Sequence, residues 1–129
     1  MAASKSSLSA GEIIRELLIN DAGVKARAGK VFPVVEDSAE LPYIVYRRTQ
    51  LEHDPVKGQR GADTVSVEVL CYTKGYAEGV ELAEAVRAVL DGAQHATDEL
   101  TLRSCYLSDG EEAWQDDAYV QQLVFTLKL

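Results

Sequence analysis

The chain has 129 residues, the usual size of one domain, and 47% of them are hydrophobic, so it can bury a core without disulfides or a structural metal. Asp and Glu number 21 against 13 Lys and Arg, and the formal net charge of −8 at pH 7 disfavours stable binding to nucleic acid or to anionic membranes. No apolar run is long enough to span a bilayer and the N-terminus lacks the apolar stretch of a signal peptide, so we expect one intracellular domain over residues 1–129 with reduced thiols.

The first predicted element is a helix that begins at Ser9, after a flexible tail over residues 1–8. Ser9 and Glu12 have the spacing of a capping box, and Leu8 can pack on Ile13 as a hydrophobic staple. An apolar stripe at helical spacing follows the cap. Its members are Ile13, Ile14, Leu17 and Leu18.

A short helix and two extended segments come next. Residues 21–28 predict a helical turn, and the glycine after it can adopt the left-handed conformation that ends helices. Residues 31–35 are apolar but contain Pro33, which is typical of an edge piece because proline donates no ladder hydrogen bond. Residues 41–48 are rich in β-branched and aromatic side chains and predict a strand.

Residues 50–62 predict a long mobile loop, because proline, glycine and charged residues are mixed there. Loops of this length are often functional or become ordered on a partner. We therefore expect a contact surface in this segment. The candidate interface residues are Asp54, Lys57 and Arg60.

The second half of the chain predicts a strand, a helix and two more strands. Apolar and polar residues alternate over 65–71, as in a half-buried strand. Gly75 can begin a helix that Asp91 and Gly92 stop, and residues 100–107 and 119–129 predict strands. We predict an α+β fold with a mainly antiparallel sheet of about four strands and helices packed on one face. The predicted order is helix, short helix, strand, strand, helix, strand, strand.

Residue types that perform chemistry are few and isolated. Cys71 lies on the apolar face of its predicted strand and Cys105 has a similar setting, so both are expected in the core. His53 and His95 lie in polar segments with no nucleophile or orienting carboxylate in view, so we expect both on the surface. We predict no catalytic residue, no cofactor and no metal site.

Acidic residues gather between the last two predicted strands, and this acidic hairpin has three possible roles. It can be a solvated loop that aids solubility, a charged surface within an assembly, or, less consistently with its spacing, a metal or acid–base site. Its acidic members are Asp109, Glu111, Glu112, Asp116 and Asp117.

Taken in order, seven segments resemble the tail-completion or tail-terminator (head–tail joining) proteins of long-tailed phages and prophages. The segments are IIRELL (13–18), DAGV (21–24), GKVFP (29–33), LPYIVY (41–46), VEVLCY (67–72), YAE (76–78) and LAEAVR (82–87). The resemblance implies an α+β domain that forms a ring, typically a hexamer, with no catalytic residues. The ring caps the tail tube, stops its growth and offers a surface to the head connector.

The same resemblance implies self-association and contacts with the tail tube protein and the head–tail connector proteins. It also implies a location in the bacterial host cytoplasm during assembly and then in the virion tail or neck. DNA passes through such a ring without stable binding, and the acidic hairpin is the candidate lining of the channel. Two alternatives remain open at this point, a small ligand-binding or enzymatic α+β domain and a monomeric adaptor that binds by strand addition.

Overall fold

The computed structural model describes residues 5–33, 40–56, 59–97 and 100–129, with the backbone alone for residues 55, 56 and 59–62. The elements, in chain order, are η1 (Ser7–Ser9), α1 (Ala10–Ile19), α2 (Ala22–Lys25), β1 (Lys30–Pro33), β2 (Tyr43–Val56), β3 (Gln59–Thr73), α3 (Tyr76–Leu90), β4 (His95–Ala96), β5 (Thr101–Leu102), β6 (Ser104–Gln115) and β7 (Ala118–Lys128). None of the helices in these ranges has the length and apolar character needed to cross a membrane.

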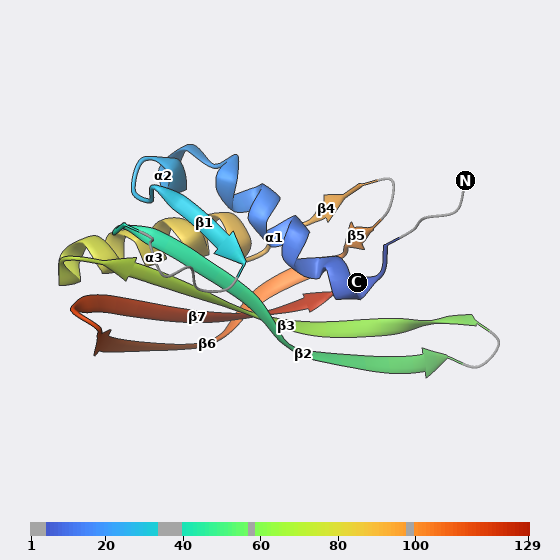
Figure 1. The fold of residues 1–129 in the computed structure, drawn as a ribbon. Helices are drawn as coiled ribbons and strands as arrows, with labels where there is room; N and C mark the ends of the chain where they lie inside the picture. The colour runs from blue at the N-terminus through green and yellow to red at the C-terminus, as the bar shows by residue number, and fades with distance from the viewer. Residues whose placement is uncertain (1–4, 34–39, 57–58, 98–99) are drawn as a thin grey trace.

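The main sheet has five strands in the order β1-β2-β3-β7-β6, and β4 pairs with β5 in a separate two-stranded sheet. Helices α1 and α3 lie on one face of the main sheet (Figure 1). The predicted α+β class, with a mainly antiparallel sheet and helices on one face, is confirmed. The fifth strand is β1, the predicted edge piece, which pairs in parallel with β2 and ends at Pro33.

The core lies between this sheet and its helices. The strand β3 contributes every second residue, as its alternating sequence predicts. The helices α1 and α3 contribute their apolar stripes, and β7 contributes the side chains of its face that is turned toward the helices. The most deeply buried members include Val65, Val67, Val69 and Cys71 of β3, Ile14 and Leu18 of α1, Leu82, Val86 and Leu90 of α3, and Phe125 and Leu127 of β7.

The start of α1 differs from the prediction. Ser9 makes no side-chain cap, so the capping box with Glu12 is not formed. Instead, the side chain of Ser6 accepts a hydrogen bond from the backbone of Leu8 and caps the 3-10 turn η1. This extra turn directs Leu8 outward, where it is 64% exposed, so the predicted hydrophobic staple is also wrong.

Ordered structure also begins earlier than predicted. Ser7 belongs to η1 and is buried, so the predicted flexible tail is wrong for its last two residues. The side chain of Ser7 hydrogen bonds to Asp63 of β3, which fixes this turn to the sheet. The rest of that prediction falls partly on residues 1–4, which lie outside the described residues.

The predicted loop over residues 50–62 is a β-hairpin. Strands β2 and β3 remain paired out to Val56 and Gln59, and Pro55 lies at a register shift where the ladder needs no donor. Beyond Thr64, which still pairs with β7, β3 pairs with β2 alone. We call residues 52–56 and 59–63 the arm, and Figure 1 shows it reaching past the body of the protein.

The C-terminal hairpin is also longer than predicted. The predicted strand over residues 100–107 is divided into β5 and the start of β6, and β6 then continues to Gln115. Asp116 and Asp117 form the two-residue turn to β7, with φ angles of 51° and 62°. Positive φ at both central residues is the signature of the type I′ turn, whose twist matches that of the flanking strands.

Candidate functional site

Two of the three predicted interface residues, Asp54 and Arg60, belong to the arm. Asp54 is exposed and pairs across the hairpin with Ala62 in the backbone register. The backbone of Arg60 lies in β3, on the strand opposite Asp54, and its side chain is outside the description. Lys57 lies outside the described residues. The structure therefore brings Asp54 and the backbone of Arg60 close to the tip of one projecting element.

A hydrogen-bonded group fixes the base of the arm. His53 Nδ1 contacts the carboxylate of Asp63, its partner across the hairpin. The hydrogen bond from Ser7, followed by that from His53, lowers the pKa of Asp63. His53 is exposed, as predicted, but it has the carboxylate partner that its sequence neighbourhood does not reveal.

The five predicted acidic residues are all exposed but do not form one patch. Asp109, Glu111 and Glu112 lie in the edge strand β6, whereas the other two form the turn. Glu111 and Glu112 are consecutive in a strand, so their side chains leave opposite faces of the sheet. Within the described part of the chain, no group of three or more His, Cys, Asp and Glu side chains is placed to hold a metal ion.

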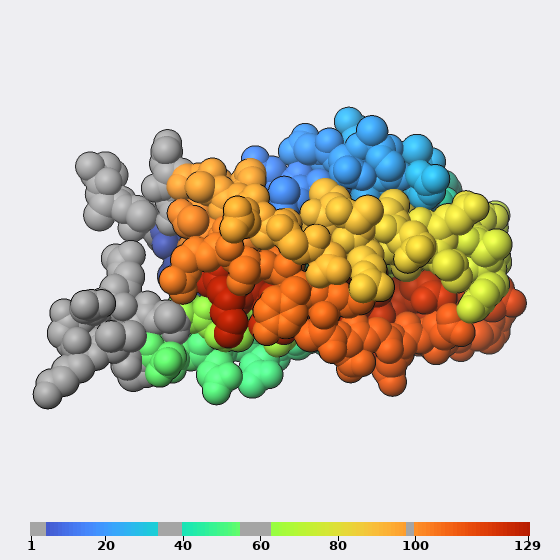
Figure 2. Space-filling view, turned by 180° about the vertical axis from the view of Figure 1, so that it is seen from behind, coloured from blue at the N-terminus to red at the C-terminus, as the bar shows by residue number. Residues whose placement is uncertain are grey.

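Beside the acidic hairpin lies a pocket that the sequence does not predict, and we call it the aromatic pocket. It is a shallow hollow of about 230 Å³ at the meeting of α3 with the β6–β7 hairpin, and Figure 2 shows these segments packed side by side. Its lining residues are Tyr76, Glu112, Ala113, Trp114, Tyr119 and Gln121. A hairpin with a two-residue turn at Asp116 and Asp117 places Trp114 opposite Tyr119, so the sequence could have predicted this pair. No local sequence pattern indicates that Tyr76 lies beside the pair.

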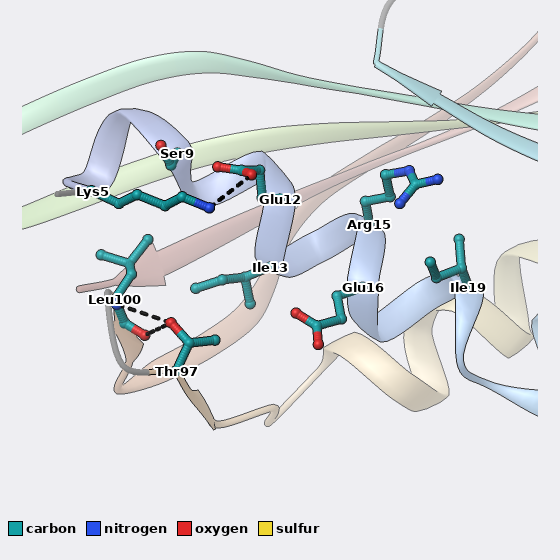
Figure 3. Close-up of a pocket in the computed structure, with 9 residues that line it drawn as sticks. All are labelled: Lys5, Ser9, Glu12, Ile13, Arg15, Glu16, Ile19, Thr97 and Leu100. Atoms are coloured by element: carbon teal, nitrogen blue, oxygen red, sulfur yellow. Dashed lines mark hydrogen bonds and ion pairs between the residues drawn. The ribbon is translucent and has the colours of Figure 1, made fainter. Parts of the chain in front are cut away.

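A larger pocket of about 390 Å³ lies between α1 and the β4–β5 hairpin (Figure 3). Lys5 is turned toward Glu12, with 3.1 Å between Nζ and Oε1. The hydroxyl of Thr97 donates to the backbone oxygen of Leu100 and closes a turn. Lys5 is thus paired with Glu12, and Thr97 with Leu100, within the lining of this pocket.

His95 lies beside that pocket and is less exposed than predicted. Its side chain is 26% exposed, and its Nε2 lies 3.5 Å from a carboxylate oxygen of Glu16 on α1. The distance suits an ion pair but does not meet hydrogen-bond geometry. The prediction of a solvated His95 is therefore wrong, because β4 packs it toward α1.

Both thiols are in the core, as predicted. Burial raises the pKa of Cys71 to about 12, and burial together with the charge of Asp91 raises the pKa of Cys105 to about 12. A thiol that remains protonated is a poor nucleophile. These cysteines contribute packing rather than chemistry.

Comparison with known proteins agrees with the resemblance that the sequence shows. Residues 12–128 match the family described as tail completion protein gp17. Among solved structures, 31 chains match this protein. One of them, from a structure described as the virion of a native gene transfer agent (GTA) particle, has a TM-score of 0.79 and 19% sequence identity, covering 89% of this chain and 90% of that chain.

At that identity the structural likeness shows a shared fold, and the family match carries the assignment. No curated protein matches the sequence. The match extends from α1 to the end of β7 and so includes every strand of the main sheet. The chain therefore belongs to the tail completion protein gp17 family, a family of structural proteins of phage tails.

Proposed function

We propose that this protein forms a closed ring that caps the tail tube, ends tube growth and joins the tail to the head. The observation that carries the proposal is the arm. The side chains of Glu52, His53 and Asp54 are exposed, and the outer strand pairs of the arm have no further neighbour in the main sheet. None of the arm side chains that the structure describes belongs to the hydrophobic core, so the arm is well suited to contact another chain.

The contact between copies would be head to tail. The arm lies at one end of the sheet, and the start of α3 lies at the other (Figure 1). A contact between two different surfaces forms a ring when the rotation between copies closes. We propose that Asp54 and Arg60 of the arm, together with Lys57, take part in this contact, with a hexamer as the expected ring.

The two remaining faces of such a ring would meet the tail tube protein and the head–tail connector proteins. Assembly would take place in the cytoplasm of the bacterial host, and the ring would then stay in the tail or neck of the virion. The protein would act by binding alone, since the family is structural and the two thiols are held protonated.

We also propose that acidic surface lines the channel of the ring, with the residues of the β6–β7 hairpin as candidates. A basic lining would bind DNA phosphates through counterion release and slow DNA passage. Acidic groups repel the phosphates over roughly 8–10 Å in physiological salt, so they have to lie close to the path. Each copy brings a net charge of −8, which the ring multiplies.

Glu111 allows a clean test of this lining. It is exposed and makes no hydrogen bond or ion pair with the described residues, so Glu111→Lys is expected to leave folding and assembly unchanged. Glu81→Lys on the exposed side of α3 makes the same change of charge elsewhere. We expect Glu111→Lys to lower DNA delivery, measured as infective particles per assembled particle, and Glu81→Lys to leave it unchanged. Equal delivery by both variants would contradict the channel role.

The capping role is tested by electron microscopy of tails assembled without this protein. If the ring terminates the tube, tails made in its absence are longer than normal, vary widely in length and carry no heads. Supplying the protein from a plasmid should restore uniform tails with heads. Tails of normal length that still attach to heads would exclude the proposed function.

A further inference from the structure

The aromatic pocket is built by the register of one hairpin and the start of one helix. Trp114 is the register partner of Tyr119, and Glu112 is the register partner of Gln121, so these four side chains share one face of the β6–β7 hairpin. Tyr76, the first residue of α3, lies over the same face and contacts Tyr119. Rigid elements therefore place all five side chains.

Trp114 and Tyr76 each contact the ring of Tyr119 in an edge-to-face arrangement. Trp114 and Tyr119 have centroids 4.7 Å apart at 64°, and Tyr76 and Tyr119 have centroids 5.8 Å apart at 77°. Trp114 is 57% exposed and Tyr76 is 49% exposed. The faces of aromatic rings carry negative partial charge and attract cations. Large, partly exposed rings of this kind are also the residue types that dominate protein–protein contacts.

Glu112 adds a full negative charge to the rim of this pocket. Its carboxylate accepts hydrogen bonds from Tyr76 Oη and Gln121 Nε2, both at 2.9 Å. These two donors are neutral, and they lower the pKa of Glu112, with Gln121 the larger cause. No lysine or arginine of the described residues forms an ion pair with it. The charge is therefore held in place and ionised, and it has no counter-ion among the residues that the structure describes.

We propose that the aromatic pocket binds an arginine side chain of a neighbouring protein in the assembled tail, with Glu112 as its counter-ion. The guanidinium is planar, so it can stack on the exposed ring of Trp114 while its N–H groups donate to the carboxylate. The chemistry of the pocket follows from its own residues. That the arginine comes from a neighbour in the tail, rather than from a free ligand, rests on the proposed function.

The test uses the purified chain and its single tryptophan. Trp114 is the only tryptophan of the sequence, so one indole N–H resonance reports on the pocket. The probes are Nα-acetyl-arginine amide and Nα-acetyl-citrulline amide, which has nearly the same shape but no charge. We expect the arginine probe to shift the resonance saturably at millimolar concentration, and the citrulline probe to bind at least about tenfold more weakly.

Two matched variants locate the counter-ion. Glu112→Gln should weaken binding of the arginine probe by about tenfold, because a charge-assisted contact becomes a neutral one. Glu111→Gln, the adjacent residue on the other face, should bind as the unchanged protein does. Equal shifts with both probes, or unchanged binding by Glu112→Gln, would overturn the assignment. The titration uses the free protein, so a negative result would not bear on ring formation. In turn, normal tails assembled without the protein would contradict the proposed function but not the binding of arginine in the pocket.

Discussion

Two carboxylates at opposite ends of the sheet are each held by side-chain hydrogen bonds. Asp63 accepts from Ser7 and His53 at the base of the arm, and Glu112 accepts from Gln121 and Tyr76 in the aromatic pocket. Both hydrogen-bond sets favour the ionised form and lower the pKa of the carboxyl group. One carboxylate at the base of the arm and one in the aromatic pocket are therefore held by hydrogen bonds within the chain.

The hydrogen bonds of Asp63 predict a pH-dependent contribution to stability. A carboxyl whose pKa is lower in the folded than in the unfolded state stabilises the fold above its unfolded pKa, about 3.9 for Asp. That stabilisation is lost as the pH falls through the folded pKa. We expect Asp63→Asn to lower the Tm at pH 7 and to have a much smaller effect at pH 2.5, measured by circular dichroism.

Asp54→Asn is the matched control, because Asp54 is exposed on the same arm and has no hydrogen-bond partner among the described residues. Its effect on the Tm should be small at both pH values. An Asp63→Asn effect as large at pH 2.5 as at pH 7 would show that Asp63 stabilises by packing rather than by charge.

At the scale of elements, the sequence predicts those whose pattern is set by burial. The alternation over residues 65–71 predicts β3 because one face packs on the helices. The sequence predicts a loop where the arm lies. None of the described arm side chains belongs to that core, so no burial pattern marks these strands, and proline and glycine are the strongest signal. The capping box predicted at Ser9 is present as a sequence motif but is not formed, because the 3-10 turn η1, capped by Ser6, precedes the helix.

The site was predictable only in part. The acidic residues of β6 are visible as a cluster in sequence, but the strand alternation that separates Glu111 from Glu112 appears only once β6 is known to continue through them. Tyr76 lies far along the chain from Trp114 and Tyr119, and only the packing of α3 brings them together. Contacts of this kind have no local pattern from which they could be derived.

The packing of α3 against β3 predicts a costly substitution at a helix position that usually favours alanine. A Cβ at Gly79 would lie 2.9 Å from Oγ1 of Thr73, whose hydroxyl is fixed by donating to the backbone oxygen of Gly75. We expect Gly79→Ala to lower the free energy of unfolding by roughly 1–2 kcal/mol, because the overlap outweighs a helix-propensity gain of about 1 kcal/mol. Urea unfolding measures the change.

A double-mutant cycle identifies the cause of that loss. In a Thr73→Ala background the obstructing hydroxyl is gone, so adding Gly79→Ala should cost little or should stabilise the protein. If the two changes are simply additive, the contact with Thr73 is not the reason for the glycine.

The arm predicts a contrast in amide hydrogen exchange. In the strand ladder, residues 53–56 and 59–63 pair only with each other, whereas residues 64–72 of β3 are flanked on both sides by other strands. We expect fast exchange in the arm of the free monomer and slow exchange in the centre of β3. In assembled tails the arm should become protected. Slow exchange across the arm in an isolated monomer would count against its role as a contact that needs a partner.

At the scale of the whole molecule, the two ends of the sheet differ in shape and chemistry. One end carries the projecting arm, and the other carries the aromatic pocket and the acidic turn (Figure 1). Two different surfaces that contact each other head to tail can close into a ring or extend into a filament. In the ring that we propose, the arm of each copy contacts the next copy, and two faces remain for the tube and the head.

The most direct test of this account is a cryo-electron microscopy reconstruction of the head-proximal end of assembled tails. We predict a single closed ring of this protein between the tail tube and the head connector, with cyclic symmetry and with the arm of each copy in contact with the next copy. Absence of the protein from this position in mature particles, or its presence only as isolated copies or two-fold dimers, would contradict the account.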